Sequence, residues 1–133
     1  MRPFVVDASA LVEVLLLTPR AATIGPLLRD PEVDLHVPGH CDLEVVSALR
    51  SGLFRKSLSA NRAEEALEDL LDLPLTRHGH QALLHRCFEL RDVLTAHDAA
   101  YVALAEGLGA ALVTADRRLA RAAEALGVSC LPA

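Results

Sequence analysis

The sequence predicts an α/β domain, a three-layer sandwich in which helices cover both faces of a central parallel β-sheet. Short apolar runs rich in β-branched residues alternate with longer segments whose apolar residues recur at helical spacing. Strands that alternate with helices pair in parallel, because each helix carries the chain back to the edge where the last strand began. The 133 residues are 52% hydrophobic, and no linker or repeat divides them. We therefore expect residues 1–133 to form a single domain.

The first half of the chain shows this alternation twice. Its first apolar run, Phe-Val-Val, leads at once into a helical pattern, which Pro19 stops. A second short apolar run is closed by Pro38-Gly39, and helical spacing then returns. The expected elements are a strand at residues 4–6, helices at 8–16 and 21–29, a strand at 35–37 and a helix at 43–49.

The second half continues the pattern with more helix. Ser59 is a suitable N-cap for an amphipathic helix that Pro74 ends. The motif Arg77-His78-Gly79-His80 is interpreted as a surface turn rather than a metal site, because no second ligand cluster stands at the usual spacing. Small residues in the segment 97–106 would let a helix pack closely on the sheet. The expected elements are helices at 59–73, 81–90 and 97–106, a strand at 111–114, a helix at 116–126 and a strand at 128–131.

The composition excludes several kinds of protein. Aromatic residues make up 3% of the chain and Trp is absent, which argues against a base-stacking surface for single-stranded nucleic acid. The net charge of −5 argues against a general nucleic-acid-binding protein, although part of the acid forms a solvated helix face at residues 64–72. Three separated cysteines favour a reducing cytoplasm, and no apolar run is long enough for a signal peptide or a membrane span.

Four acidic residues are candidates for a ligand site, and two of them stand where a parallel sheet places its ligands. Asp7 and Asp116 fall at or just beyond the carboxyl ends of expected strands, where such sheets bind ligands. Asp98 lies in the first turn of a helix, and Glu44 lies near the start of another. Each has an ordinary alternative: Asp7 and Asp116 could only cap helices, Asp98 could only suit the helix dipole, and Glu44 could face solvent.

The surroundings of these acids favour a bound cation. Asp7 lies between apolar segments, and seven uncharged residues follow Asp98. A carboxylate beside buried segments is costly unless a cation compensates it, and few basic residues are near in sequence. Mg²⁺ or Mn²⁺ would suit the oxygen ligands. Ser9 and Thr114 could orient a carboxylate or a metal-bound water, or could simply cap helices.

Four segments carry a resemblance to a known family. The chain resembles a PIN-domain endoribonuclease, and more narrowly a VapC-type toxin of bacterial type II toxin–antitoxin pairs. The segments occur in the family's order and span nearly the whole chain. They are Val5-Val6-Asp7-Ala8-Ser9-Ala10-Leu11, Pro38 through Glu44 to Leu49, Thr95-Ala96-His97-Asp98-Ala99-Ala100-Tyr101-Val102-Ala103-Leu104-Ala105 and Leu112-Val113-Thr114-Ala115-Asp116.

The resemblance implies a PIN-like fold and a Mg²⁺-dependent site made of Asp7, Glu44, Asp98 and Asp116. It implies that Asp7 and Asp98 bind the metal directly, and that Glu44 and Asp116 bind it directly or through water. It also implies a homodimer and a VapB-like antitoxin whose C-terminal part occupies the acidic groove, with DNA bound only through that antitoxin. One departure is His97, where many relatives have Tyr.

The expected reaction is hydrolysis of an RNA phosphodiester. Metal ions stabilise charge on the phosphate and lower the pKa of a bound water, which Glu44 or Asp116 could position or deprotonate. One metal or two would both be compatible with four carboxylates. Arginine suits phosphate binding, although for each candidate taken singly a role as a soluble surface residue is favoured. The candidates are Arg50, Arg55, Arg91 and Arg117.

Other functions fit the sequence less well. A haloacid-dehalogenase-like phosphatase needs a second Asp where this chain has Ser9, and a late lysine where the chain has none, since Lys56 is its only lysine. A response-regulator receiver needs an early acidic pair and a late lysine at a strand end, and this chain has neither. One remaining alternative is a catalytically inactive PIN-like scaffold or partner-binding subunit, although all four acidic positions are intact. Another is a DNA repressor subunit, which the acidic charge and the lack of a basic helix disfavour.

Overall fold

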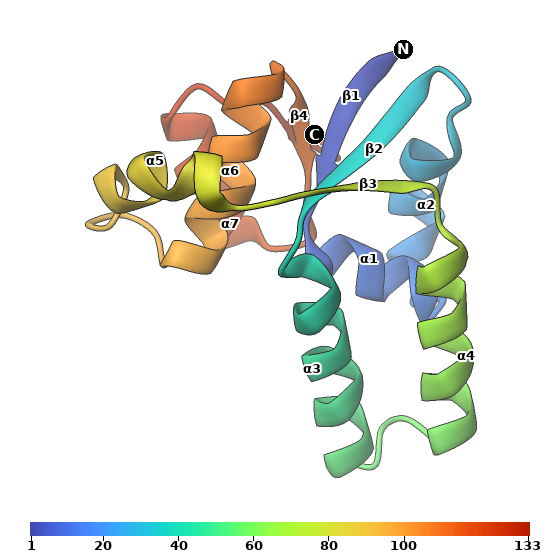
Figure 1. The fold of residues 1–133 in the computed structure, drawn as a ribbon. Coiled ribbons are helices and arrows are strands. Elements are labelled where there is room, and N and C mark those ends of the chain that lie inside the picture. The colour runs from blue at the N-terminus through green and yellow to red at the C-terminus, as the bar shows by residue number, and fades with distance from the viewer.

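The computed structural model describes all 133 residues and contains one five-stranded sheet, in the order β3-β2-β1-β4-β5 (Figure 1). Every neighbouring pair of strands is parallel, as the alternation of strands and helices predicts. The strands are β1 (Arg2–Val6), β2 (Val33–Pro38), β3 (Leu75–His78), β4 (Ala111–Val113) and β5 (Cys130–Leu131).

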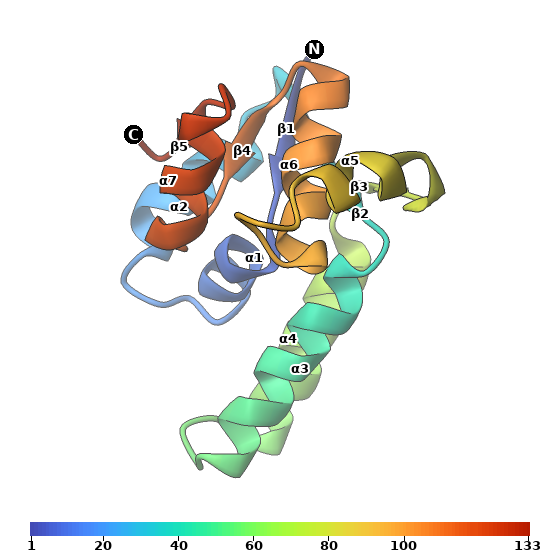
Figure 2. The same ribbon diagram turned by 90° about the vertical axis from the view of Figure 1, so that its left-hand side faces the viewer.

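Helices connect the strands and cover the sheet. Helix α6 packs across β1, β2 and β4, while α2 contacts β2 from the other side, so the sheet lies between two helical layers (Figures 1 and 2). The predicted three-layer arrangement is therefore confirmed. The helices are α1 (Ala8–Leu15), α2 (Ala21–Arg29), α3 (Cys41–Phe54), α4 (Ala60–Asp72), α5 (Leu84–Glu89), α6 (Ala96–Leu108) and α7 (Arg117–Ala125), with a short 3₁₀ turn at Gln81–Leu83.

The strand order reverses beside β1. The chain steps outward from β1 through β2 to β3, then crosses back to β4 and continues to β5 on the other side. In a parallel sheet the connecting helices run back along the strands, so their N-termini gather at the edge where the strands end. The reversal therefore places the ends of β1 and β4 next to each other, under the starts of several helices.

The core explains why α6 lies so close to the sheet. All seven residues from Ala99 to Ala105 are buried, and four of them are alanines. Their small side chains let the helix backbone approach β1 and β4, the two strands at the centre of the core, whose residues Val6 and Leu112 are fully buried. The helix ends at Gly109, which has a positive φ of 62° that a residue without a side chain adopts easily.

The structure corrects the prediction at β3. Leu75–His78 is a strand that pairs with β2, so the interpretation of Arg77 and His78 as part of a surface turn is wrong; only Gly79 and His80 lie outside it. This strand is at the edge of the sheet and none of its residues is buried. The strand therefore lacks the apolar run that is typical of a buried parallel strand. It is identified by its backbone pairing with β2, which the sequence does not show.

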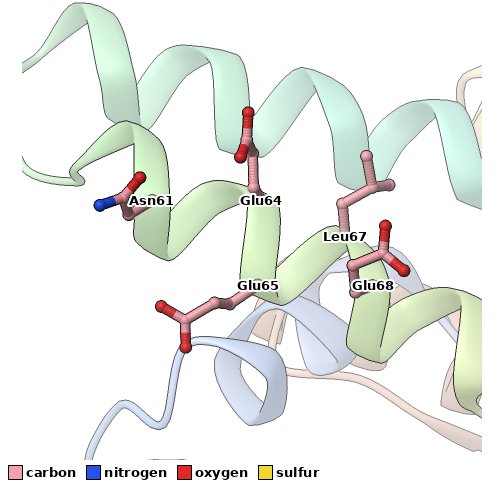
Figure 3. Close-up of a pocket in the computed structure, with 5 residues that line it drawn as sticks. All are labelled: Asn61, Glu64, Glu65, Leu67 and Glu68. Atoms are coloured by element: carbon pink, nitrogen blue, oxygen red, sulfur yellow. The ribbon is translucent and has the colours of Figure 1, made fainter.

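Helices α3 and α4 form an antiparallel pair that extends beyond the sheet (Figures 1 and 2). Ser59 caps α4 by accepting from the Arg62 backbone N–H at 3.2 Å, as its position predicts. The outer side of α4 carries Glu64, Glu65 and Glu68 around a surface hollow (Figure 3). These side chains are exposed, which confirms a solvated acidic face. None of the helices has the length and apolar character that crossing a bilayer requires.

Candidate functional site

The four predicted carboxylates all lie at starts of helices. Asp7 is the N-cap of α1, and Asp116 is the N-cap of α7. Glu44 and Asp98 lie in the first turns of α3 and α6. Backbone N–H groups and the helix dipole favour negative charge at these positions. The capping roles that the sequence left open for Asp7 and Asp116 therefore exist.

Asp7 follows β1 directly and is buried, with 4% of its surface exposed. Its Oδ1 accepts hydrogen bonds from Ser9 Oγ at 2.7 Å and from the Ala10 backbone N–H at 3.0 Å, while its Oδ2 accepts one from Thr114 Oγ1 at 2.8 Å. Burial raises its pKa to about 6, even though these hydrogen bonds favour the ionised form. No basic side chain forms an ion pair with it, so Asp7 is a buried acid without a counter-charge.

Ser9 and Thr114 tie the ends of β1 and β4 together. Thr114 Oγ1 donates to Asp7 and also accepts from the Asp116 backbone N–H at 3.0 Å. Ser9 Oγ accepts from the Ala115 N–H at 3.0 Å and lies 3.4 Å from Thr114 Oγ1. These bonds fix the Asp7 carboxylate next to the start of α7, where the charge of Asp116 contributes to the raised pKa of Asp7.

Asp98 and Asp116 share one cationic partner, Arg118. Its Nη2 lies 2.9 Å from Asp98 Oδ2 and 3.7 Å from Asp116 Oδ2. The two carboxylates come from different helices and face the same nitrogen, so they lie close enough to bind one positive charge between them. The Arg118 side chain is 66% exposed, whereas that of Asp98 is 19% exposed. A cation in solution could therefore compete for the two acids by displacing an exposed arginine.

Glu44 reaches this edge from α3, beside a small aromatic cluster. The Tyr101 hydroxyl donates to Glu44 Oε1 at 2.5 Å, and His40 Nε2 lies 3.5 Å from the same oxygen. Burial raises the pKa of Tyr101, with Cys41 and Glu44 adding to the shift, so the phenol keeps its proton. Burial also raises the pKa of the Cys41 thiol to about 12, and the charges of Asp42, Glu44 and Asp7 contribute.

The structure brings these acids to one edge of the sheet, but it does not place them close enough to form a complete set of ligands for one ion. Asp7 is linked to Asp116 through Thr114, and Asp116 to Asp98 through Arg118, whereas Glu44 approaches beside Cys41 and Tyr101. No three Asp, Glu, His or Cys side chains lie close enough to ligate one ion directly. Mg²⁺ commonly takes only one or two protein carboxylates and keeps several waters, so the oxygen donors present fit it.

The sequence did not single out Arg118 or Tyr101. Arg118 stands in the first turn of α7, where the helix dipole disfavours a positive charge. A positive charge at this end of a helix indicates that acidic side chains lie nearby, so the sequence did contain a signal for Arg118. Tyr101 lies three residues after Asp98, one helical turn further along α6, so it too is near the site by helical spacing. Its bond to Glu44 depends on how the starts of α3 and α6 come together and could not be read from spacing.

Of the four arginines considered for phosphate binding, only Arg117 lines a cavity together with a site carboxylate. It borders a cavity of about 330 Å³ with Asp116 and with Arg20, whose Nη1 donates to the Ala115 carbonyl at 2.8 Å. Arg50 and Arg91 instead lie over the rings of Phe54 and Phe88, and Arg55 stands at the end of α3. Arg20 was missed because it lies between two helices, far from any acid in sequence.

Comparisons with known proteins agree with this architecture. Residues 4–125 match the family model described as the PIN domain. The chain is 42% identical over 117 residues to a Mycobacterium tuberculosis protein named ribonuclease VapC12, covering 88% of this chain and 89% of that one. It is 43% identical over 119 residues to ribonuclease VapC3 of the same species, covering 89% and 85% of the two chains.

Solved structures share the fold at lower sequence identity. PAE2754 from Pyrobaculum aerophilum superposes with a TM-score of 0.70 at 23% identity, covering 98% of this chain and 84% of that one. Mycobacterium tuberculosis VapC20, titled a sarcin-ricin loop cleaving toxin, gives 0.69 at 16% identity, covering 90% and 94%. The matched family model, the sequence relatives and the parallel sheet lead to one conclusion: the chain belongs to the PIN-domain family, and its relatives include VapC ribonucleases.

Proposed function

We propose that this protein is a metal-dependent endoribonuclease, the toxin of a type II toxin–antitoxin pair, with its active site at Asp7, Glu44, Asp98 and Asp116. The observation that carries the proposal is the buried Asp7 carboxylate, which has no basic partner and lies beside Asp116. A buried acid of this kind is stabilised by a bound cation. The names of the VapC ribonuclease relatives support the choice of RNA as substrate.

Asp7 and Asp98 would hold Mg²⁺, or Mn²⁺, directly, with Glu44 and Asp116 holding it directly or through water. Bound Mg²⁺ supplies charge to stabilise the phosphate and lowers the pKa of water. Ser9 and Thr114 keep the Asp7 carboxylate in one orientation by donating to both of its oxygens. Tyr101 fixes Glu44 by donating to Oε1, which leaves Oε2 of Glu44 available to accept a proton from a water.

Arg20 and Arg117 are suited to bind the RNA backbone next to this site. They line the cavity that Thr114 and Asp116 also border, so a phosphate there would lie beside Asp116. Arginine binds phosphate oxygens through several N–H donors at once. Two arginines at the site also explain how a chain with a net charge of −5 could bind a polyanion, since the local charge matters more than the total.

A VapB-like antitoxin and a second copy of this chain are the proposed protein partners. Several large apolar side chains on the outer faces of α3 and α5 are exposed, as expected for surfaces that other chains cover. Among the solved neighbours, VapBC2 from Rickettsia felis is described as bound to a DNA fragment from its promoter; it has a TM-score of 0.65 and 16% identity and covers 96% of each chain. We propose that any DNA contact of this protein is made through its antitoxin, and that it acts in the cytoplasm. The exposed side chains are Leu43, Val46, Phe54, Leu84 and Phe88.

Cleavage of a structured RNA tests the proposal. The wild-type protein should cleave in Mg²⁺ or Mn²⁺ and should stop in EDTA. Asp7→Asn should reduce the rate by about 100-fold or more, because it weakens the cation site on which charge stabilisation depends. Arg121→Ala is the matched control, since Arg121 is an exposed residue of α7 outside the site.

RNA that stays intact under all of these conditions would contradict the proposal. That result would favour the inactive scaffold or partner-binding subunit. Activity that persists in EDTA and in Asp7→Asn would also contradict it, since cleavage would then come from another site or from a contaminant.

A further inference from the structure

A small cavity beside the acidic edge has three histidines in its walls. Its volume is about 190 Å³, and it lies between the starts of α3 and α6 and the first turn of α5. It is smaller than the roughly 300–1,000 Å³ of most sites for drug-sized ligands, so it has room for one ring system. We name it the histidine pocket; its lining includes His40, His80, Leu84, Cys87, His97 and Ala100.

The histidine pocket adjoins two of the proposed catalytic carboxylates. His97 immediately precedes Asp98 in the chain, and His40 lies one helical turn before Glu44, with Nε2 at 3.5 Å from Glu44 Oε1. A phosphate held by these acids would therefore lie near the pocket, at a place from which an adjoining base could enter it.

The rings in and behind the pocket form a packed aromatic wall. The His40 ring meets His97 nearly edge-on, with centroids 5.2 Å apart, and meets Tyr101 in the same manner at 5.1 Å. His40 Nε2 also bonds the His97 carbonyl oxygen at 3.1 Å, which holds the start of α3 against the start of α6. The wall is therefore built before any ligand arrives.

The polar groups of the pocket are suited to a neutral ligand with hydrogen-bonding edges. The side chains of His80 and His97 are exposed and form no hydrogen bond with another protein group. A neutral imidazole has one nitrogen that donates a hydrogen bond and one that accepts, so these rings can pair with either donors or acceptors on the edge of a ligand. No carboxylate, lysine or arginine lines the pocket, and Leu84, Cys87 and Ala100 supply apolar surface.

We propose that the histidine pocket binds one unstacked nucleobase of the RNA, next to the phosphate that is cleaved, and so sets the sequence preference of cleavage. The proposal rests on the proposed ribonuclease function. Sequence-specific recognition of RNA commonly takes a base out of its stack, places it on an aromatic ring such as histidine and reads its edge by hydrogen bonds. The low aromatic content of the chain does not exclude this, because histidine supplies the rings.

Cleavage of an RNA pool with randomised sequence, read by sequencing of the cut ends, tests the proposal. The wild-type protein should prefer certain bases at one position beside the cut. His80→Ala and His97→Ala should each flatten that preference by about fivefold or more, the range expected for loss of a stacked base. His85→Ala, an exposed histidine of α5 outside the pocket, should leave the preference unchanged. An unaltered preference in both pocket variants, with cleavage intact, would overturn the proposal.

A second measurement separates failure of the pocket from failure of the ribonuclease function. Free nucleosides, which carry no phosphate, should shift the imidazole NMR signals of His80 and His97 in the metal-free protein, while ribose 5-phosphate should not. If the wild-type protein cleaves no RNA, the ribonuclease proposal fails and this titration alone decides the pocket. No shift with any nucleoside would overturn base binding. Loss of dimerisation in the pocket variants without any shift would also overturn it, by assigning the surface to a second copy of this chain.

Discussion

Asp7 carries an electrostatic cost that its neighbours reduce but do not remove. Its two oxygens accept three hydrogen bonds, yet burial still raises the pKa from 3.8 to about 6. A folded-state pKa above the unfolded value means that the protonated acid favours the fold. This contribution is fully present below the unfolded pKa and is lost as the pH rises through about 6.

Asp7→Asn should therefore stabilise the protein while it inactivates it. In EDTA at pH 7.5 the variant should unfold with a free energy higher by about 2–3 kcal/mol, since each pKa unit corresponds to about 1.4 kcal/mol. The gain should fall to nearly zero by about pH 3, well below the unfolded pKa of 3.8, where the wild-type acid is protonated in both states. Urea unfolding at several pH values measures this, and a variant less stable than wild type at pH 7.5 would contradict it.

Arg118 should compete with a metal ion for Asp98 and Asp116. Removing it in Arg118→Ala leaves the two acids without a positive partner, so Mn²⁺ should bind about twofold to fivefold more tightly, in line with the strength of an exposed ion pair. Calorimetric titration measures the affinity. Arg121→Ala removes the same charge from α7 away from the acids and should change it less. Weaker binding to Arg118→Ala would show that the arginine supports the site instead.

At the scale of single elements, the helix starts decide both stability and geometry. Thr95 caps α6 by accepting from the Asp98 backbone N–H at 3.2 Å, and Ser59 caps α4 in the same way, with Arg62 as the donor. The two caps are chemically alike, but only the first holds a proposed metal ligand. They therefore allow stability and site geometry to be separated.

Thr95→Ala and Ser59→Ala should each lower the free energy of unfolding by about 1 kcal/mol, the usual cost of losing a cap. Thr95→Ala should also slow RNA cleavage by several fold, since the first turn of α6 then frays and Asp98 loses its position. Ser59→Ala should leave cleavage unchanged. Thermal unfolding and cleavage rates measured on both variants test this, and equal rates in the two variants would contradict the role of the α6 cap.

The elements that the sequence predicted well were those whose evidence is local. The apolar run of β1, the cap and proline around α4 and the small residues of α6 each indicate their structure without knowledge of the rest. Strand β3 was missed because it is an exposed edge strand, which pairing with β2 stabilises. In the same way, the bond of Ser9 to Asp7 follows from a spacing of two residues. The bond of Thr114 to Asp7 instead needs β1 to pair with β4, and the bond of Tyr101 to Glu44 needs two helix starts to come together.

At the scale of the whole molecule, the topology brings distant carboxylates to one edge. Asp7 and Thr114 are more than a hundred residues apart, yet they are hydrogen-bonded because β1 pairs with β4 where the strand order reverses. A parallel sheet turns four separate helix starts into one acidic edge. Strand ends in the sequence predicted that Asp7 and Asp116 would meet, whereas the site that also includes Glu44 and Asp98 came from the family resemblance. The sequence could not predict that Arg118 lies between Asp98 and Asp116, since that depends on how α6 and α7 approach each other.

The central claim is that these four carboxylates hold a divalent cation together. Anomalous scattering from a crystal soaked in Mn²⁺ tests it most directly, because the signal locates the ion itself. We expect a peak bound by Asp7 and Asp98, with Glu44 and Asp116 reaching it directly or through water, and with Arg118 displaced from its present position. No peak among these side chains at millimolar Mn²⁺, or a peak only elsewhere on the surface, would contradict the account.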